Sequence, residues 1–179
     1  MPIWAKASGS SFKPSPAGPA VARCCDVVDL GMVKSSFKDE QGRTKVQHKV
    51  RLVWQLADPD PETGKRPIVS ERYTLSLHEK ATLRQHLESW RGRPFTDKEL
   101  AGFDVETVIG VPAYLNIVHE HREGNTYANV RAVMPPPKGS VVPLVEGYTR
   151  VCERQPDPPE DGQDGTEGYV PDDDDSVPF

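Results

Sequence analysis

The sequence predicts a mostly β fold of five strands with one helical insert. Apolar and polar residues alternate along residues 46–56 and again along 68–77, the two-residue period of a strand with one buried face. The period then becomes helical, because Leu83, Leu87 and Trp90 recur at i, i+4 and i+7. A hydrophobic content of 36% and 18 prolines in 179 residues indicate an ordered middle between disordered ends.

The first part of the chain predicts an arm followed by three strands. Residues 1–19 are rich in Ser, Gly, Pro and Ala and predict a flexible N-terminal arm that contains Trp4 and Phe12. The β-rich run from Val21 to Val33 is the first expected strand, and a polar loop follows it. The two alternating segments, Val46 to Leu56 and Ile68 to Leu77, are the second and third.

Helix-start signals follow the third strand. Ser76 and Glu79 have the spacing of a capping box, and this helix is expected to end near Arg91 and Gly92. Thr96 and Glu99 form a second such pair, and Asp104 marks a third start.

Two further strands complete the body, which we place at residues 20–137. They run from Val111 to His119 and from Thr126 to Met134, with a hairpin loop around Gly124. Residues 138–179 are expected to be mostly disordered, with Val141 to Val151 lying against the body.

The order of three strands, a helical insert and two strands favours a five-stranded OB-fold barrel with the insert between strands three and four. Other five-stranded α+β arrangements remain open at this point. An OB barrel binds oligonucleotides across its strand two–three face and through the loops that join strands one–two and four–five.

The net charge of −5 combines two parts of opposite sign. Residues 153–179 contain ten acidic residues and one base, Arg154, a charge of −9, whereas the rest of the chain has 21 bases and 17 acids, a charge of +4. A mildly basic body with an acidic tail indicates a polyanion-binding surface for which the tail can compete.

Cysteine usage and hydropathy predict a cytoplasmic protein. The three cysteines, Cys24, Cys25 and Cys152, have neither disulfide-framework nor zinc-ligand spacing. There is no apolar run long enough to span a membrane and no signal peptide. We expect no cofactor.

The tail ends in a motif that predicts partner binding. Four carboxylates precede an apolar tip, an arrangement that a pocket with a basic rim could capture, although a solvated acidic tail is the alternative. The expected partner-binding tip consists of Asp172, Asp173, Asp174, Asp175, Val177, Pro178 and Phe179.

Basic and aromatic residues gather where an OB barrel would bind a strand. Lys and Arg track phosphates, and aromatic rings stack on bases without reading sequence. The alternation assigns Trp54 and Tyr73 to the core, and the helical stripe assigns Trp90 to it. Phe37 and Tyr127 are therefore the stacking candidates. The alternative is that the basic residues form a solvated sheet face. The candidate nucleic-acid-binding residues are Lys34, Phe37, Lys38, Arg43, Lys45, Lys49, Arg51, Arg72, Arg122, Tyr127 and Arg131.

The tail resembles the acidic tip of bacterial SSB proteins, which ends Asp-Asp-Asp-Ile-Pro-Phe. Val177 stands in place of the Ile, and Ser176 interrupts the acids. The body resembles a group of bacteriophage single-stranded DNA-binding proteins with an OB body, in residues 27–31, 73–77, 87–95 and 127–130. These resemblances imply a protein that coats single-stranded DNA, a tail that recruits replication, recombination or repair proteins and competes with DNA, and a homo-oligomer as one option.

Two other functions are weighed against this expectation. One is a protein-interaction adaptor of the replication machinery, whose barrel binds protein. The other is a metal-dependent nuclease that uses His119 and His121, which lie on one face of a strand but lack a third ligand at suitable spacing. The sequence contains no Walker loop and no GxSxG motif, so we expect a protein that is not an enzyme.

Overall fold

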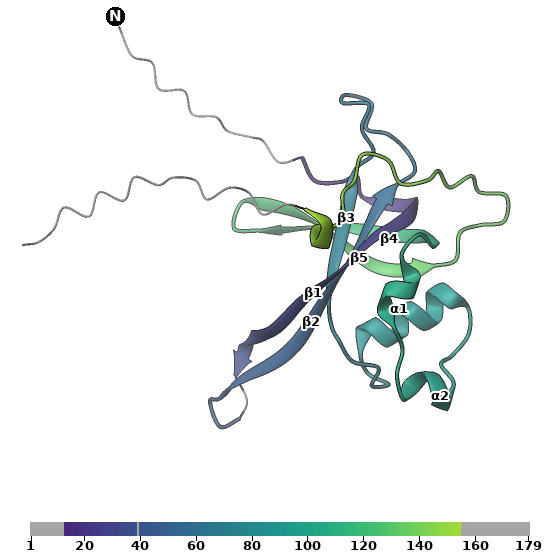
Figure 1. Ribbon diagram of the computed structural model, residues 1–179. Helices are drawn as coiled ribbons and strands as arrows, with labels where there is room; N and C mark the ends of the chain where they lie inside the picture. Colours follow the sequence, from purple (N-terminus) through teal and green to yellow (C-terminus); the bar gives the residue numbers. More distant parts are fainter. Residues whose placement is uncertain (1–12, 39, 155–179) are drawn as a thin grey trace, which may run out of the picture.

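The computed structural model describes residues 13–38 and 40–154, with no side-chain description for 36–38, and it is a mostly β protein as expected. The strands are β1 (Gly18–Lys38), β2 (Thr44–Leu56), β3 (Ile68–Thr74), β4 (Pro112–Arg122) and β5 (Asn125–Met134). They form one antiparallel sheet in the order β3-β2-β1-β4-β5 (Figure 1). The predictions for Trp4, Phe12 and the acidic tip lie outside the described residues.

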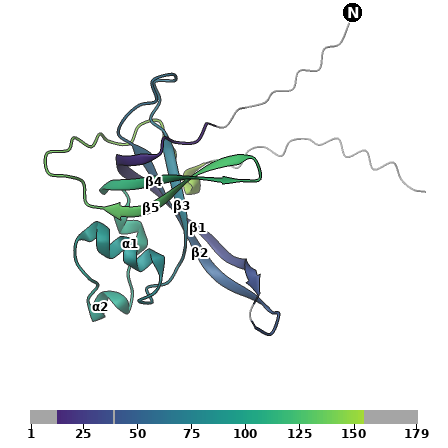
Figure 2. The same cartoon turned by 180° about the vertical axis from the view of Figure 1, so that it is seen from behind.

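The helical insert lies between β3 and β4, as predicted, and packs on one side of the sheet (Figure 2). It consists of α1 (Thr82–Arg91), α2 (Asp97–Leu100) and the short 3-10 helix η1 (Val105–Val108). The stripe of Leu83, Leu87 and Trp90 is buried, so the helical period was interpreted correctly.

Two of the three predicted helix starts are confirmed. Thr96 and Glu99 form a reciprocal capping box, and the Asp104 side chain accepts a hydrogen bond from the backbone N–H of Glu106. The box predicted at Ser76 is wrong, because its hydroxyl instead accepts from the His78 backbone N–H at 3.2 Å in a turn. The helix starts at Thr82, with Ala81 at the N-cap and no side-chain cap.

The sheet is open, with β3 and β5 as its two edges, so ladder hydrogen bonds among the described residues do not close the expected OB-fold barrel. Instead, the Glu71 carboxylate of β3 accepts a hydrogen bond from the Val130 backbone N–H of β5 at 2.9 Å. A side chain thus stands where a backbone partner would, and it bridges the two edges. β3 is also shorter than predicted, because the Ser76 N–H turns back to the Thr74 carbonyl at 2.8 Å.

The core lies between the sheet and the insert and contains the aromatic residues assigned to it. Trp54 is fully buried, and its ring centroid lies 6.1 Å from that of Trp90. The Trp90 indole N–H donates to the Pro112 carbonyl at 2.8 Å, which satisfies its one polar atom. Tyr73 is buried as well.

The paired strands β1 and β2 extend beyond the rest of the sheet (Figure 1). β1 pairs with β4 only over Gly18–Arg23, and β2 pairs with β3 only over Lys49–Gln55. Residues 31–38 and 40–47, which we call the β1–β2 arm, therefore extend as a two-stranded segment beyond the pairing with β3 and β4. β1 begins earlier and ends later than the sequence predicted.

The chain after β5 returns across the sheet to end beside β1, as the yellow-green segment in Figure 1 shows. We call residues 141–151 the C-terminal strap. The Arg23 guanidinium donates to the carbonyls of Val142 and Pro143 at 2.8 and 2.9 Å, and Gln55 exchanges two hydrogen bonds with the backbone of Glu146 at 2.7 and 2.9 Å. The strap thus lies against the body, as expected for residues 141–151.

The part of the expected N-terminal arm that the structure describes also contacts the body. The Ser15 hydroxyl donates to the Ile68 carbonyl at 2.9 Å, and the Lys13 ammonium pairs with Glu62 at 2.9 Å. Among the described residues, no helix has the length and apolar character needed to cross a membrane.

Candidate nucleic-acid interface

Three predicted basic residues share the outer face of β2 and β3. Along β2, Val50, Leu52 and Trp54 are buried in the core, so the intervening Lys49 and Arg51 point to the opposite face. Arg51 lies directly across from Arg72 of β3. Lys49 lies across from Thr74 and donates to its hydroxyl at 2.7 Å.

The Arg51–Arg72 pair is unfavourable in the free protein. Like charges directly opposite each other on a sheet are destabilising, and no carboxylate in the described part of the chain forms an ion pair with either guanidinium. The Arg51 Nε atom is also buried without a hydrogen-bond partner. A buried donor without an acceptor costs about 1–3 kcal/mol. An anion bound beside the two guanidinium groups on this face would relieve the charge repulsion.

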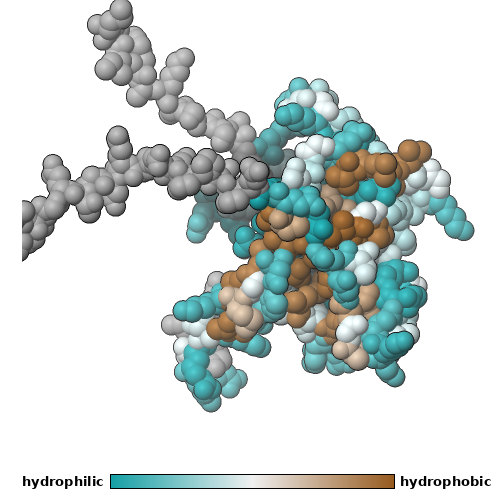
Figure 3. Space-filling view, in the orientation of Figure 1, coloured by the Kyte–Doolittle hydropathy of each residue, from teal (hydrophilic) through white to brown (hydrophobic). Residues whose placement is uncertain are grey.

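The β1–β2 arm presents basic residues together with exposed apolar ones. Lys34, Arg43 and Lys45 are exposed, and the Arg43 guanidinium contacts the Gln41 side chain. Phe37 and Lys38 belong to β1, but their side chains are outside the description. Met32 is 67% exposed, and Val33 and Val46 are also exposed. Figure 3 shows these hydrophobic surfaces on the arm among hydrophilic ones.

The predicted residues of the β4–β5 hairpin come together but are partly neutralised. The two loop residues, Glu123 and Gly124, have φ of 50° and 80°, as a type I′ turn requires. The Glu120 carboxylate pairs with Arg122 at 2.7 Å and also with Arg131. Tyr127 lies across from Glu120 and is 47% exposed. One carboxylate therefore offsets part of the charge of two arginines.

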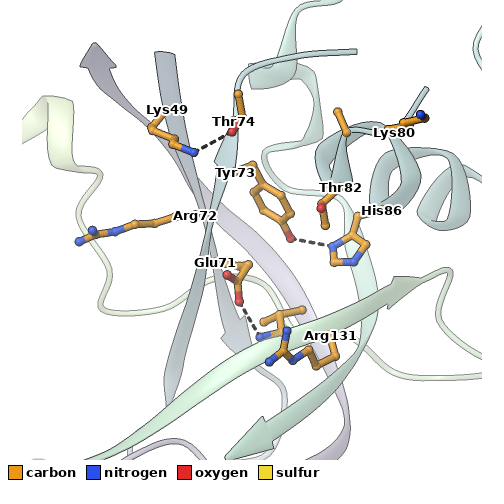
Figure 4. Close-up of a pocket in the computed structure, with 11 residues that line it drawn as sticks. Lys49, Glu71, Arg72, Tyr73, Thr74, Lys80, Thr82, His86 and Arg131 are labelled. Atoms are coloured by element: carbon orange, nitrogen blue, oxygen red, sulfur yellow. Dashed lines mark hydrogen bonds between the residues drawn. The ribbon is translucent and has the colours of Figure 1, made fainter. Parts of the chain in front are cut away.

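A polar pocket of about 440 Å³ opens at the free edge of β3, between β5 and the start of α1. Figure 4 shows Tyr73 and His86 meeting inside it while Arg72 points away from them across β3. Its basic wall residues are Lys49, Arg72, Lys80 and Arg131. The pocket thus continues the positive surface around the edge of the sheet, and Lys80 is a residue that the sequence analysis did not select.

Burial governs the titratable groups of this pocket. It lowers the pKa of His86, raises the pKa of Tyr73 and raises the pKa of Glu71. The Tyr73 hydroxyl and the His86 Nδ1 atom are 2.9 Å apart. A neutral imidazole accepts this hydrogen bond from the phenol, so the pair holds the two side chains in place.

The two histidines considered as metal ligands have other partners. The His119 Nε2–H donates to the Ser15 carbonyl at 2.7 Å, and His121 Nδ1 lies 2.9 Å from the Thr126 hydroxyl. Within residues 13–38 and 40–154, no group of three His, Cys, Asp or Glu side chains is arranged to hold a metal ion.

The C-terminal strap contributes functional candidates that the sequence analysis missed. Buried Asp26 accepts hydrogen bonds from the Tyr148 hydroxyl at 3.1 Å, the Arg150 Nε–H at 3.2 Å and the Val151 backbone N–H at 2.8 Å. The only signal in the sequence was an aromatic residue after the apolar run at 141–145. Comparison with known proteins gives no further guide, because no protein-family model and no curated protein matches this chain.

Proposed function

We propose that this protein binds single-stranded DNA without sequence preference, protects the strand and is not an enzyme. The observation that carries the proposal is the Arg51–Arg72 pair, in which two like charges lie directly opposite each other on the outer face of β2 and β3. A phosphate backbone supplies the acceptors and the negative charge that this face lacks. Lys49 and Lys45 extend the same positive surface towards the β1–β2 arm.

The arrangement of strands supports an OB-fold for the body. In the sheet order β3-β2-β1-β4-β5, β3 and β5 are the strands that would meet if the sheet closed, and the insert lies between β3 and β4. The OB-fold is a five-stranded and partly open Greek-key barrel, which accommodates the open edge bridged by Glu71. Its binding face and loops correspond here to β2–β3, the β1–β2 arm and the β4–β5 hairpin.

The partner role of the tail rests on its sequence. We propose that Asp172 to Asp175 and the tip Val177, Pro178 and Phe179 recruit proteins of DNA replication, recombination or repair. From the resemblance to phage proteins, we propose that this activity takes place in the cytoplasm of a bacterial host.

Fluorescence anisotropy tests the DNA-binding proposal. We expect the protein to bind an oligothymidine strand more tightly than a duplex of equal length, with affinity that falls between about 50 and 200 mM salt. The double variant Arg51→Glu, Arg72→Glu should lose most of this binding. Lys98→Glu, a single charge reversal on exposed Lys98 of α2, is the control for a general effect of charge.

Two outcomes would contradict the proposal. Equal or tighter binding to duplex at moderate salt would exclude a single-strand preference. Unchanged DNA binding by the double variant would show that the outer face of β2 and β3 does not bind DNA. It would favour the protein-interaction adaptor.

A further inference from the structure

A second pocket lies on the outer face of β2 and β3, at the end away from the arginine pair. It has a volume of about 670 Å³ and lies between the β2–β3 loop and the C-terminal strap. Its lining includes Gln55, Pro59, Lys65, Arg66, Ile68 and Tyr148. The pocket therefore joins an aromatic ring from the strap to basic residues from the loop.

This pocket and the arginine pair belong to one continuous face. Gln55 pairs with Ile68 across β2 and β3, and Arg51 pairs with Arg72 four residues further along the same strands. An even spacing keeps both pairs on one side of the sheet. At about 3.3 Å per residue they lie roughly 13 Å apart, a distance that a bound strand easily spans.

The Tyr148 side chain is held in place at this pocket. Its hydroxyl donates to the Asp26 carboxylate, and Asp26 is 1% exposed. Burial and the nearby Asp26 charge raise the pKa of Tyr148 to about 12, so the phenol remains a neutral donor. The Arg150 and Val151 bonds to the same carboxylate fix the strap just after Tyr148. The ring is thus preorganised before any ligand arrives.

The ring face already accepts a planar group. The Arg154 guanidinium carbon lies over the Tyr148 ring, 5.3 Å from its centroid. A nucleobase is planar too and stacks on aromatic side chains of any neighbouring sequence. Arg66 is committed to the strap through the Leu144 carbonyl at 3.1 Å and Glu146 at 3.4 Å, and the Arg154 Nε–H donates to the Thr149 carbonyl at 3.0 Å, which leaves Lys65 to meet a phosphate.

We propose that Tyr148 is a base-stacking residue, and that the C-terminal strap and the β2–β3 loop form a second part of the groove that binds single-stranded DNA. This inference rests on the proposed function. It adds an aromatic platform that is independent of the arm and of the β4–β5 hairpin, where the sequence placed the stacking residues.

Two variants of the full chain test what the aromatic ring of Tyr148 contributes to DNA binding. Tyr148→Phe and Tyr148→Leu both lose the bond to Asp26, but only Tyr148→Phe keeps an aromatic face. The loss of one stack corresponds to about a tenfold change in affinity. We therefore expect Tyr148→Leu to bind oligothymidine about tenfold more weakly than Tyr148→Phe. Equal affinities of the two variants would overturn the inference.

A third variant, Tyr148→Trp, reports on stacking directly. The wild type contains Trp4, Trp54 and Trp90, so the emission of the new indole is read as the difference between this variant and the wild type. Oligothymidine at saturation should quench that difference, and an unchanged emission would contradict stacking at this site. If the wild type binds oligothymidine and neither effect appears, only the Tyr148 assignment fails. If the wild type does not bind, the proposed function fails with it.

Discussion

The Glu71 carboxylate of β3 and the Val130 backbone N–H of β5 form a 2.9 Å hydrogen bond that bridges the two edges of the sheet. A main-chain donor at a sheet edge must find an acceptor, and here a side chain supplies it. The same carboxylate is partly buried, and that burial raises its pKa. One residue therefore links the geometry of the two sheet edges to pH.

Glu71→Gln should remove this pH dependence while keeping an acceptor for Val130. Because the folded state raises the Glu71 pKa above 4.5, the proton is bound more tightly in the folded than in the unfolded chain. The Glu71 contribution to stability is therefore full below pH 4.5 and is lost as pH rises through the folded pKa. We expect the stability of the variant relative to the wild type to increase from acidic to neutral pH.

Urea unfolding of both proteins over that pH range gives the measurement, and the other carboxylates cancel in the difference. Glu71→Ala is the companion variant, since it leaves the Val130 donor without an acceptor and should cost about 1–3 kcal/mol. A stability difference between Glu71→Gln and wild type that stays constant with pH would contradict this role.

Asp26 should determine whether the C-terminal strap stays on the body. Its buried carboxylate has three donors, including the Arg150 guanidinium at 3.2 Å. Its removal leaves the Tyr148 and Val151 donors without their acceptor, at a cost of about 1–3 kcal/mol, while Arg150 keeps its pair with Glu106. Asp26→Ala should therefore lower the free energy of unfolding by an amount of this order and speed amide exchange throughout residues 141–151. Slow exchange in that segment of the variant would show that Arg23 and Gln55 suffice to hold it.

The strands were predictable because their alternation reflects a physical requirement. Val50, Leu52 and Trp54 had to face one side whatever the fold, and the structure buries all three. The open edge at Glu71 was not predictable, because a carboxylate that replaces a backbone partner leaves no periodic signal. The helix start predicted at Ser76 was wrong for a related reason, because a short polar side chain can cap a helix or close a turn.

The candidate site was predictable in part. Lys49, Arg51 and Arg72 were assigned to one face by alternation, and the register places them there. The strap was harder, because its contacts with Arg23, Gln55 and Asp26 join residues about 90 to 125 positions apart. Contacts at such separation depend on the completed sheet, so Tyr148 could not be assigned from local pattern.

Arg72→Thr should increase stability and decrease DNA affinity. The substitution ends the repulsion with Arg51, and Thr suits a strand, so at low salt the free energy of unfolding should rise by about 0.2–1 kcal/mol. Loss of a phosphate contact should reduce the slope of log affinity against log salt by about 1. Thermal unfolding and anisotropy titrations check the two effects. A variant that gains stability and keeps full affinity would place the bound strand elsewhere.

Glu120→Gln should release Arg122 and Arg131 for DNA. Both guanidinium groups pair with this carboxylate, so the substitution adds one positive charge to the β4–β5 hairpin. We expect tighter binding to oligothymidine and a steeper salt dependence than in the wild type. Glu62→Gln is the matched control, because Glu62 also pairs with a base, Lys13, on a different loop. An equal gain in both variants would indicate a general charge effect.

Truncation after Arg154 should raise the affinity for single-stranded DNA. Residues 155–179 contain nine acids and no base, so the truncation removes a charge of −9 while it leaves the C-terminal strap and Arg154 in place. A tethered polyanion competes with DNA for the basic face, and the competition weakens as salt screens it. The gain in affinity should therefore be largest at low salt. A variant with Asn at positions 172–175 keeps the length of the tail and should show part of the gain. Equal affinities of the truncated and full chains at low salt would limit the tail to partner recruitment.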